Sequence, residues 1–389
     1  MTMQFWLLVF SVSAVIATIF WYFAIHRQRT TVQEDSYTRG LEQWLNGDIN
    51  EAILSMREAI DNDPSSIDPY LQLANLLRES GDARRAAVLH RGLTVRPGVN
   101  TQKQFSISLA LAQDLLELGK WQEAKELLGT LQRHNPNTPI FWESRFRQWA
   151  GMEEHDEAAK TLKSAIKKVP AGHRETFSDW YELYQLDRAQ IANSEDQSSL
   201  ARKLVKSIEK VSSNYPYRLV IESQAALVDQ DFESCATIST EGLLNNPTHV
   251  DLFFPLLEKA LLSSGRYERT IPILESACHH DSAPASLIVA LAILYDKVGD
   301  RERAVRLLSN KSGDPQFTPV AVAPFLKLLV NDLPPSDFTC VWESIYLSPD
   351  NLNWQCAECG RFFNSKRWYC SSCNNFDTVE KSTSVEDQD

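Results

Sequence analysis

The stretch LANLLRESGDARRAAVLH, residues 73–90, decides the fold of this chain. Small and apolar residues recur in it at helical spacing on both sides of Gly81, a residue type that marks a turn. Gly47 and Ala52 precede Gly81 and Ala86 by the same distance of 34 residues. The pattern therefore predicts two helices joined by a tight turn, in a unit that repeats along the chain.

Other pairs of residues keep the same spacing of 34: Ala124 and Ala158, Pro136 and Pro170, and Gly265 and Gly299. This is the period of tetratricopeptide repeats, which place small residues where the two helices cross and a proline where the second helix ends. Four consecutive units fit over residues 33–172, the pattern is irregular at 173–250, and it recovers over 251–318. We expect an all-α superhelical solenoid of about eight helix pairs over residues 33–335; a generic helical bundle is the alternative.

The composition favours a helical fold and argues against some classes of function. Only 14 of 389 residues are glycine, which suits helical arrays better than folds with many tight turns. The net charge of -12 argues against nucleic-acid binding, which needs a positive surface. The sequence also has no GxSxG, HExxH, GxGxxG or phosphate-loop motif, so we expect no enzyme.

A solenoid leaves a groove lined mainly by the first helix of each pair. Aligning the repeats points four polar side chains into that groove: Asn75, Arg78, Gln113 and Arg147. We interpret them as candidate contacts to a partner protein. The alternative is an ordinary solvated helix face.

Residues 4–25 contain no charged side chain over 22 positions. A helix of that length spans about 33 Å, enough to cross a bilayer core. The first basic residues, Arg27 and Arg29, follow the segment directly, which favours a cytoplasmic location for the rest of the chain. We therefore expect residues 1–32 to form a transmembrane anchor with its juxtamembrane segment; a cleaved signal peptide and a buried helix are the alternatives.

Near the C-terminus, two Cys-x-x-Cys pairs are separated by ten residues: Cys356 and Cys359, then Cys370 and Cys373. Two such pairs can bring four thiolates to one tetrahedral metal ion, either zinc or iron. All four positions are protein ligands, so the site has no open position and should be structural. Gly360 and Asn374 follow the second cysteine of each pair, where a positive φ is often required.

The residues on either side of the four cysteines predict a small module and a tail. We expect residues 336–377 to hold a connector and a small rubredoxin-like or zinc-ribbon β module, whose folding depends on the metal. Residues 378–389 are polar and acidic, and we expect a disordered tail. An iron ion at the same thiolates would instead permit electron transfer.

The order of uncharged segment, repeat array and four-cysteine module resembles the lipopolysaccharide assembly protein B (LapB) family over nearly the whole chain. Residues 73–82, with Arg85, Ala86 and His90, resemble that family's most characteristic repeat. The run Trp368-Tyr369-Cys370 resembles its rubredoxin-type module. The chain departs from the family at Ser371, where a proline is usual, and at Phe376, where a tryptophan is usual.

This resemblance implies a single-pass protein of the bacterial cell inner membrane with its bulk on the cytoplasmic side. It implies a non-enzymatic adaptor that regulates lipopolysaccharide biosynthesis by promoting degradation of the deacetylase LpxC by the membrane protease FtsH. An inner-membrane regulator of lipopolysaccharide synthesis would oppose it. A membrane-anchored rubredoxin-like electron carrier, a general interaction scaffold with other clients, and a periplasmic scaffold of reversed topology are the alternatives; the oligomeric state, including a homodimer, stays open.

Overall fold

The computed structural model describes residues 36–134, 136–278, 283–309 and 354–381. It divides into two compact units, Met1–Arg174 and Glu175–Asp389, and each is described by itself. The predicted anchor at residues 1–32 lies outside the described residues, as does most of the connector. Among the helices within the described ranges, none combines the length and the apolar character needed to cross a membrane.

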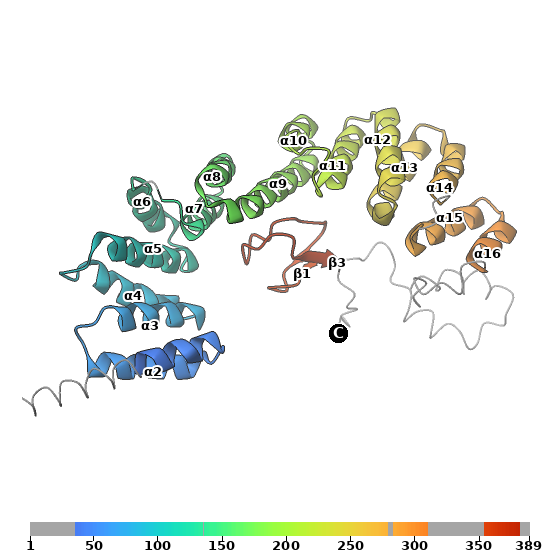
Figure 1. The fold of residues 1–389 in the computed structure, drawn as a ribbon. Coiled ribbons are helices and arrows are strands. Elements are labelled where there is room, and N and C mark those ends of the chain that lie inside the picture. The colour runs from blue at the N-terminus through green and yellow to red at the C-terminus, as the bar shows by residue number, and fades with distance from the viewer. Residues whose placement is uncertain (1–35, 135, 279–282, 310–353, 382–389) are drawn as a thin grey trace, which may run out of the picture. The chain divides into compact units, whose positions relative to one another are not determined.

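The first unit contains four helix pairs in its described residues (Figure 1). Helices α2 to α8 each contact the next along the chain, and Tyr37 and Leu41 of the first helix pack in one cluster with residues of α2, so the pairs stack in series. The helices are residues 36–45, α2 (Ile49–Asn62), α3 (Asp68–Glu79), α4 (Ala83–Thr94), α5 (Thr101–Glu117), α6 (Trp121–Gln132), α7 (Pro139–Gly151) and α8 (His155–Lys168).

The repeat residues take the positions that the period predicts. Four alanines, each in the second helix of its pair, have no exposed surface: Ala52, Ala86, Ala124 and Ala158. Between the helices, Gly81 has φ +88°, a left-handed conformation that glycine adopts at little cost. Asp82 follows it and accepts a hydrogen bond from the backbone N–H of Arg85, which caps α4. Small residues and glycine turns thus fix how closely the helices pack.

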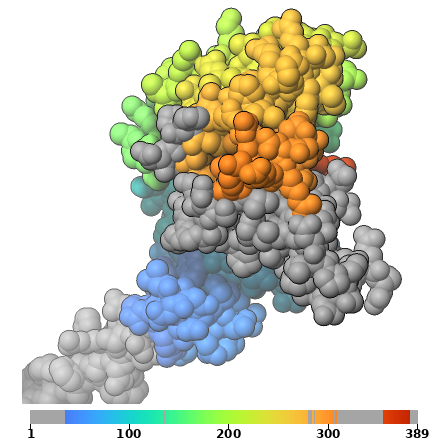
Figure 2. Space-filling view, turned by 90° about the vertical axis from the view of Figure 1, so that its right-hand side faces the viewer, coloured from blue at the N-terminus to red at the C-terminus, as the bar shows by residue number. Residues whose placement is uncertain are grey.

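The second unit also contains four helix pairs in its described residues. Figure 2 shows the face of this unit that α13 to α16 form, in yellow and orange. The largest apolar cluster centres there, around Phe253, Leu257 and Leu291. Its helices are α9 (Ala171–Ser194), α10 (Ser198–Val205), α11 (Tyr215–Val228), α12 (Phe232–Asn245), α13 (Val250–Ser263), α14 (Thr270–Cys278), α15 (Ala285–Lys297) and α16 (Arg301–Ser309), with short 3-10 turns η1 (Pro247–His249) and η2 (Tyr267–Arg269).

The irregular region of the sequence begins with unequal helices. α9 has 24 residues, whereas its partner α10 has only 8. The pattern is weak along α9 because part of its buried surface contacts the C-terminal module rather than other helices. The next helix, α11, begins at Tyr215.

The C-terminal module is a three-stranded antiparallel sheet of order β2-β1-β3. β1 (Trp354–Cys356) pairs with β2 (Phe362–Phe363) and with β3 (Val379–Lys381). The prediction of a disordered tail from residue 378 is therefore wrong for residues 379–381. Val379 is fully buried and packs in one cluster with Cys356. Its strand pairs with β1, and the polar composition of the surrounding residues does not predict that pairing. Residues 382–389 lie outside the described residues.

Candidate metal centre and groove

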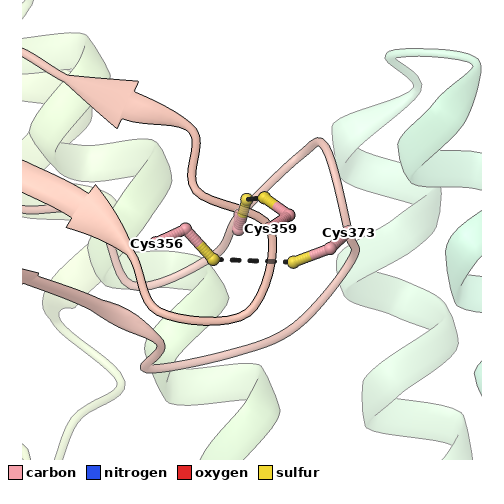
Figure 3. A group of neighbouring side chains, drawn as sticks. Cys356, Cys359 and Cys373 are labelled. Atoms are coloured by element: carbon pink, nitrogen blue, oxygen red, sulfur yellow. Dashed lines mark hydrogen bonds between the residues drawn. The ribbon is translucent and has the colours of Figure 1, made fainter.

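The four cysteines of the module meet at one point. Their sulfur atoms all lie within 4.8 Å of one another. Figure 3 shows Cys356 and Cys373 facing each other, with Sγ atoms 3.6 Å apart, and the sulfurs of Cys359 and Cys370 are also 3.6 Å apart. With metal–sulfur bonds of about 2.3 Å, a tetrahedral ion holds its sulfurs about 3.8 Å apart. The arrangement therefore fits one metal ion.

Two similar turns present these sulfurs. In the first, the Gly360 N–H donates to the carbonyl of Cys356 at 2.9 Å, and in the second the Asn374 N–H donates to that of Cys370 at 2.8 Å. Gly360 has φ 73° and Asn374 has φ 61°, which confirms the positive φ predicted at both positions. Each turn closes tightly because its last residue tolerates the left-handed conformation.

Three of the four thiols have shifted acidities in the absence of a bound ion. Burial opposes ionisation of Cys356, but hydrogen bonds from the Thr378 hydroxyl and from backbone amides outweigh it and lower the pKa to about 6. Burial raises the pKa of Cys370, and it raises that of Cys373 to about 12. The surroundings therefore favour the thiolate of Cys356, and a nearby cation would be needed to keep Cys370 and Cys373 ionised.

The donor set fits zinc or iron, since both accept four thiolates. Cys356, Cys359, Cys370 and Cys373 would hold the ion, and no ligand position would remain for water or substrate. Such an ion would cross-link the two turns. It would not activate a nucleophile.

The second turn of the module is held by helix α9. Arg367 donates two hydrogen bonds to Asp187, at 2.6 and 2.8 Å, and the backbone N–H of Trp368 donates a third at 3.2 Å. The Asp187 side chain is only 3% exposed. The Asp187 contact raises the pKa of the Arg367 guanidinium and keeps it charged. This paired arrangement satisfies a carboxylate that would otherwise be costly to bury.

Aromatic contacts surround that ion pair. Trp368 is 2% exposed and packs in one cluster with apolar residues of α9, α10 and α11. Trp180 of α9 stacks on Phe376 with ring centroids 5.3 Å apart, and Tyr184 meets Tyr369 edge to face at 5.5 Å. The prediction from sequence did not include these residues. An aspartate among the mainly apolar buried residues of α9 is a signal that could have pointed to them.

Three of the four predicted groove residues come together in the first unit. Asn75 and Arg78 of α3 and Gln113 of α5 line a groove of about 1220 Å³. Apolar side chains of α5, including Phe105 and Leu109, line it as well. Arg147 of α7 is not among its lining residues; its guanidinium lies 2.7 Å from a carboxylate oxygen of Glu117 instead.

Arg78 is held rigidly in the wall of this groove. It donates to Asp114 at 2.9 Å and to the side-chain oxygen of Asn75 at 3.1 Å. Asp114 is fully buried, and its other oxygen lies 2.6 Å from Nδ1 of the buried His90. Helices α3, α4 and α5 are thus joined by one polar network whose outer end reaches the groove.

Comparison with known proteins supports the repeat assignment. A tetratricopeptide repeat model matches residues 109–173, which cover α6, α7 and α8 and part of α5. No curated protein matches the chain significantly. The match and the helix pairs together support tetratricopeptide repeats in a chain that also carries a four-cysteine cluster.

Solved structures of repeat proteins resemble the chain only distantly. A thermophilic TPR protein of Thermus thermophilus is 15% identical and covers 59% of this chain and 99% of its own, with a TM-score of 0.31. A tetratricopeptide repeat protein from Parabacteroides merdae is 13% identical and covers 77% and 99%, with a TM-score of 0.30. Because both scores are below 0.5, the assignment rests on the sequence match and the helix pairs.

Proposed function

We propose that the chain is a non-enzymatic scaffold that holds a segment of a partner protein in the groove of its first unit. The observation that carries this proposal is the groove itself. Asn75, Arg78 and Gln113 line it from two first helices, and the network behind Arg78 fixes its shape. Amide side chains can donate and accept hydrogen bonds with an extended backbone, while Phe105 and Leu109 offer apolar contacts.

We further propose that this scaffold acts at the bacterial inner membrane. The uncharged residues 4–25 would anchor it, with the bulk of the chain on the cytoplasmic side. The resemblance to the LapB family supports a role as an adaptor that brings the deacetylase LpxC to the protease FtsH. Anchoring raises the effective concentration of the groove near a membrane-bound partner without requiring tighter contacts.

The half-life of LpxC in cells with and without the chain tests the adaptor role. Deletion of the gene should lengthen that half-life, and the intact chain should restore it. An unchanged half-life would reject the adaptor role and leave a scaffold with other clients. A reporter fused after residue 389 tests the proposed topology independently.

A groove variant links that result to the site. Gln113→Trp places a bulky ring in the groove and should fail to restore rapid LpxC turnover. The control is Arg57→Gln, an exposed change on α2 outside the groove, which should restore it fully. If both variants restore turnover equally, the groove does not hold the relevant partner.

A further inference from the structure

The four cysteines of the metal centre are unequally accessible. Cys370 is fully buried, Cys356 is 1% exposed, and Cys373 is partly buried. Cys359 is exposed, and the residues that follow it, Gly360 and Arg361, are exposed as well. The residues that lead into the second turn, Trp368 to Cys370, are buried, and Trp368 packs against α9, whereas residues 357–361 of the first turn are exposed.

We propose that Cys359 is an oxidative modification site whose reaction with hydrogen peroxide releases the metal and loosens the module from α9. The oxidation of cysteine follows its thiolate character and its exposure. All four cysteines have thiolate character when an ion is bound, so exposure decides which reacts first. This inference rests on metal binding by the four cysteines and does not depend on the adaptor role.

The reaction balances with peroxide as the oxidant. The sulfur of Cys359 attacks one peroxide oxygen, the O–O bond breaks, and a sulfenic acid and hydroxide form. The sulfur of Cys370, 3.6 Å away, then attacks the sulfenic sulfur, so that an S–S bond forms and a second hydroxide leaves. Two sulfurs have lost two electrons in total and peroxide has gained them. Both hydroxides end as water after taking up protons from solvent.

The product cannot keep the original geometry. A disulfide needs its sulfurs about 2 Å apart, so Cys359 and Cys370 must approach each other, and two of the four ligands are lost. Cys370 directly follows Trp368 and Tyr369, which pack against α9 and its neighbours. Displacement of Cys370 therefore disturbs the contacts that hold the module on the helices.

The test uses the full chain loaded with zinc, because zinc itself undergoes no redox change. Its zinc content is measured first, since a chain that binds no zinc would show that the metal assignment is wrong. Hydrogen peroxide is then added, and zinc release is followed with a coloured chelator. Peptide mass spectrometry identifies the disulfides, and hydrogen exchange reports on α9 and α11. We expect one zinc released per chain, a Cys359–Cys370 disulfide as the first product, and faster exchange in both helices.

A matched pair of variants separates this reaction from general damage. Cys359→His keeps a zinc ligand but cannot form the disulfide, so zinc release should slow about tenfold or more. Cys278→Ser removes a thiol outside the cluster and should leave release unchanged. An initial Cys356–Cys373 disulfide, or zinc release from Cys359→His at the wild-type rate, would overturn the proposal, as would zinc loss without a change in α9 exchange.

Discussion

At the residue scale, Asp114 links three helices of the first unit. It is fully buried in α5, and each of its oxygens has a separate partner, Arg78 and His90. Because a buried charge is tolerated only when its partners remain, the three residues act as one group. The network therefore sets both the packing of three helices and the position of Arg78 in the groove.

We predict that Asp114→Asn destabilises α3, α4 and α5 by about 2–4 kcal/mol, because it removes the charge opposite a largely buried guanidinium. Hydrogen exchange of slowly exchanging amides in these helices measures the loss. The control is Arg91→Gln, which breaks an exposed pair with Glu123 and should cost about 0.5 kcal/mol or less. Equal effects of the two variants would contradict the special role of Asp114.

Two tyrosines of the second unit predict a loss of stability at high pH. Tyr267 donates to Glu258 at 2.8 Å and Tyr295 donates to Glu275 at 2.5 Å. Burial and these carboxylates raise the pKa of both phenols to about 12. Their stabilisation is therefore complete below the unfolded pKa of about 10 and is lost as the pH rises through 12.

Melting temperatures measured between pH 9 and 12 check this expectation. The double variant Tyr267→Phe, Tyr295→Phe should show a shallower alkaline decline than the wild type. Tyr70→Phe in α3 controls for the loss of a hydroxyl elsewhere in the chain. An alkaline decline of the same steepness in the double variant would refute the assignment to these two pairs.

At the scale of elements, glycine decides how closely α12 and α13 approach. A Cβ atom added at Gly242 would lie 2.2 Å from the ring of Phe253, which is fully buried. We predict that Gly242→Ala destabilises the second unit by about 1–3 kcal/mol. Gly129→Ala in α6 meets no neighbour within 4 Å and should stabilise the first unit by about 1 kcal/mol or less. Thermal unfolding distinguishes the two, and a loss of stability in both would contradict the packing argument.

The contact between α9 and the C-terminal module provides a second test at this scale. Arg367→Lys keeps the charge but loses the paired hydrogen bonds to Asp187, and we expect the docked state to weaken by about 1–3 kcal/mol. Hydrogen exchange in α9 and in residues 354–381 measures the change. The same substitution at the exposed Arg361 should have little effect. Unchanged exchange in Arg367→Lys would show that the aromatic contacts suffice.

The sequence predicts those features whose residues lie close together along the chain, and it does not predict contacts between distant residues. Ala52 and Ala86, the glycine turns and the four cysteines follow local spacing, and the structure places them as expected. The contact between Arg367 and Asp187 joins residues 180 positions apart. No periodic pattern in the sequence indicates it. The strand at Val379 was missed because its partner strand, not its composition, stabilises it. Arg147 does not line the groove that holds Asn75, Arg78 and Gln113, and alignment of the repeats does not reveal its pairing with Glu117.

At the scale of the whole molecule, removal of the metal should affect the two units differently. We predict that a strong zinc chelator unfolds residues 354–381 and speeds hydrogen exchange in α9 and α11, since an ion held by the four cysteines would stabilise the module that packs on these helices. Helices α3 to α8 should keep their protection. Exchange that rises equally in both units, or a module that stays protected without metal, would contradict this prediction.

The distance along the chain between Asp187 and Arg367 also affects how the protein is made. These partners are 180 residues apart, so a ribosome adding about 5–20 residues per second completes α9 about 10–40 s before the module emerges. Throughout that interval the nascent chain carries an unpaired Asp187 beside uncovered Trp180 and Tyr184 rings. The last few dozen residues thus cover the side chains of a helix that was synthesised long before them. A chain stopped by a premature codon ahead of residue 354 would present that aromatic surface permanently to chaperones and quality-control proteases.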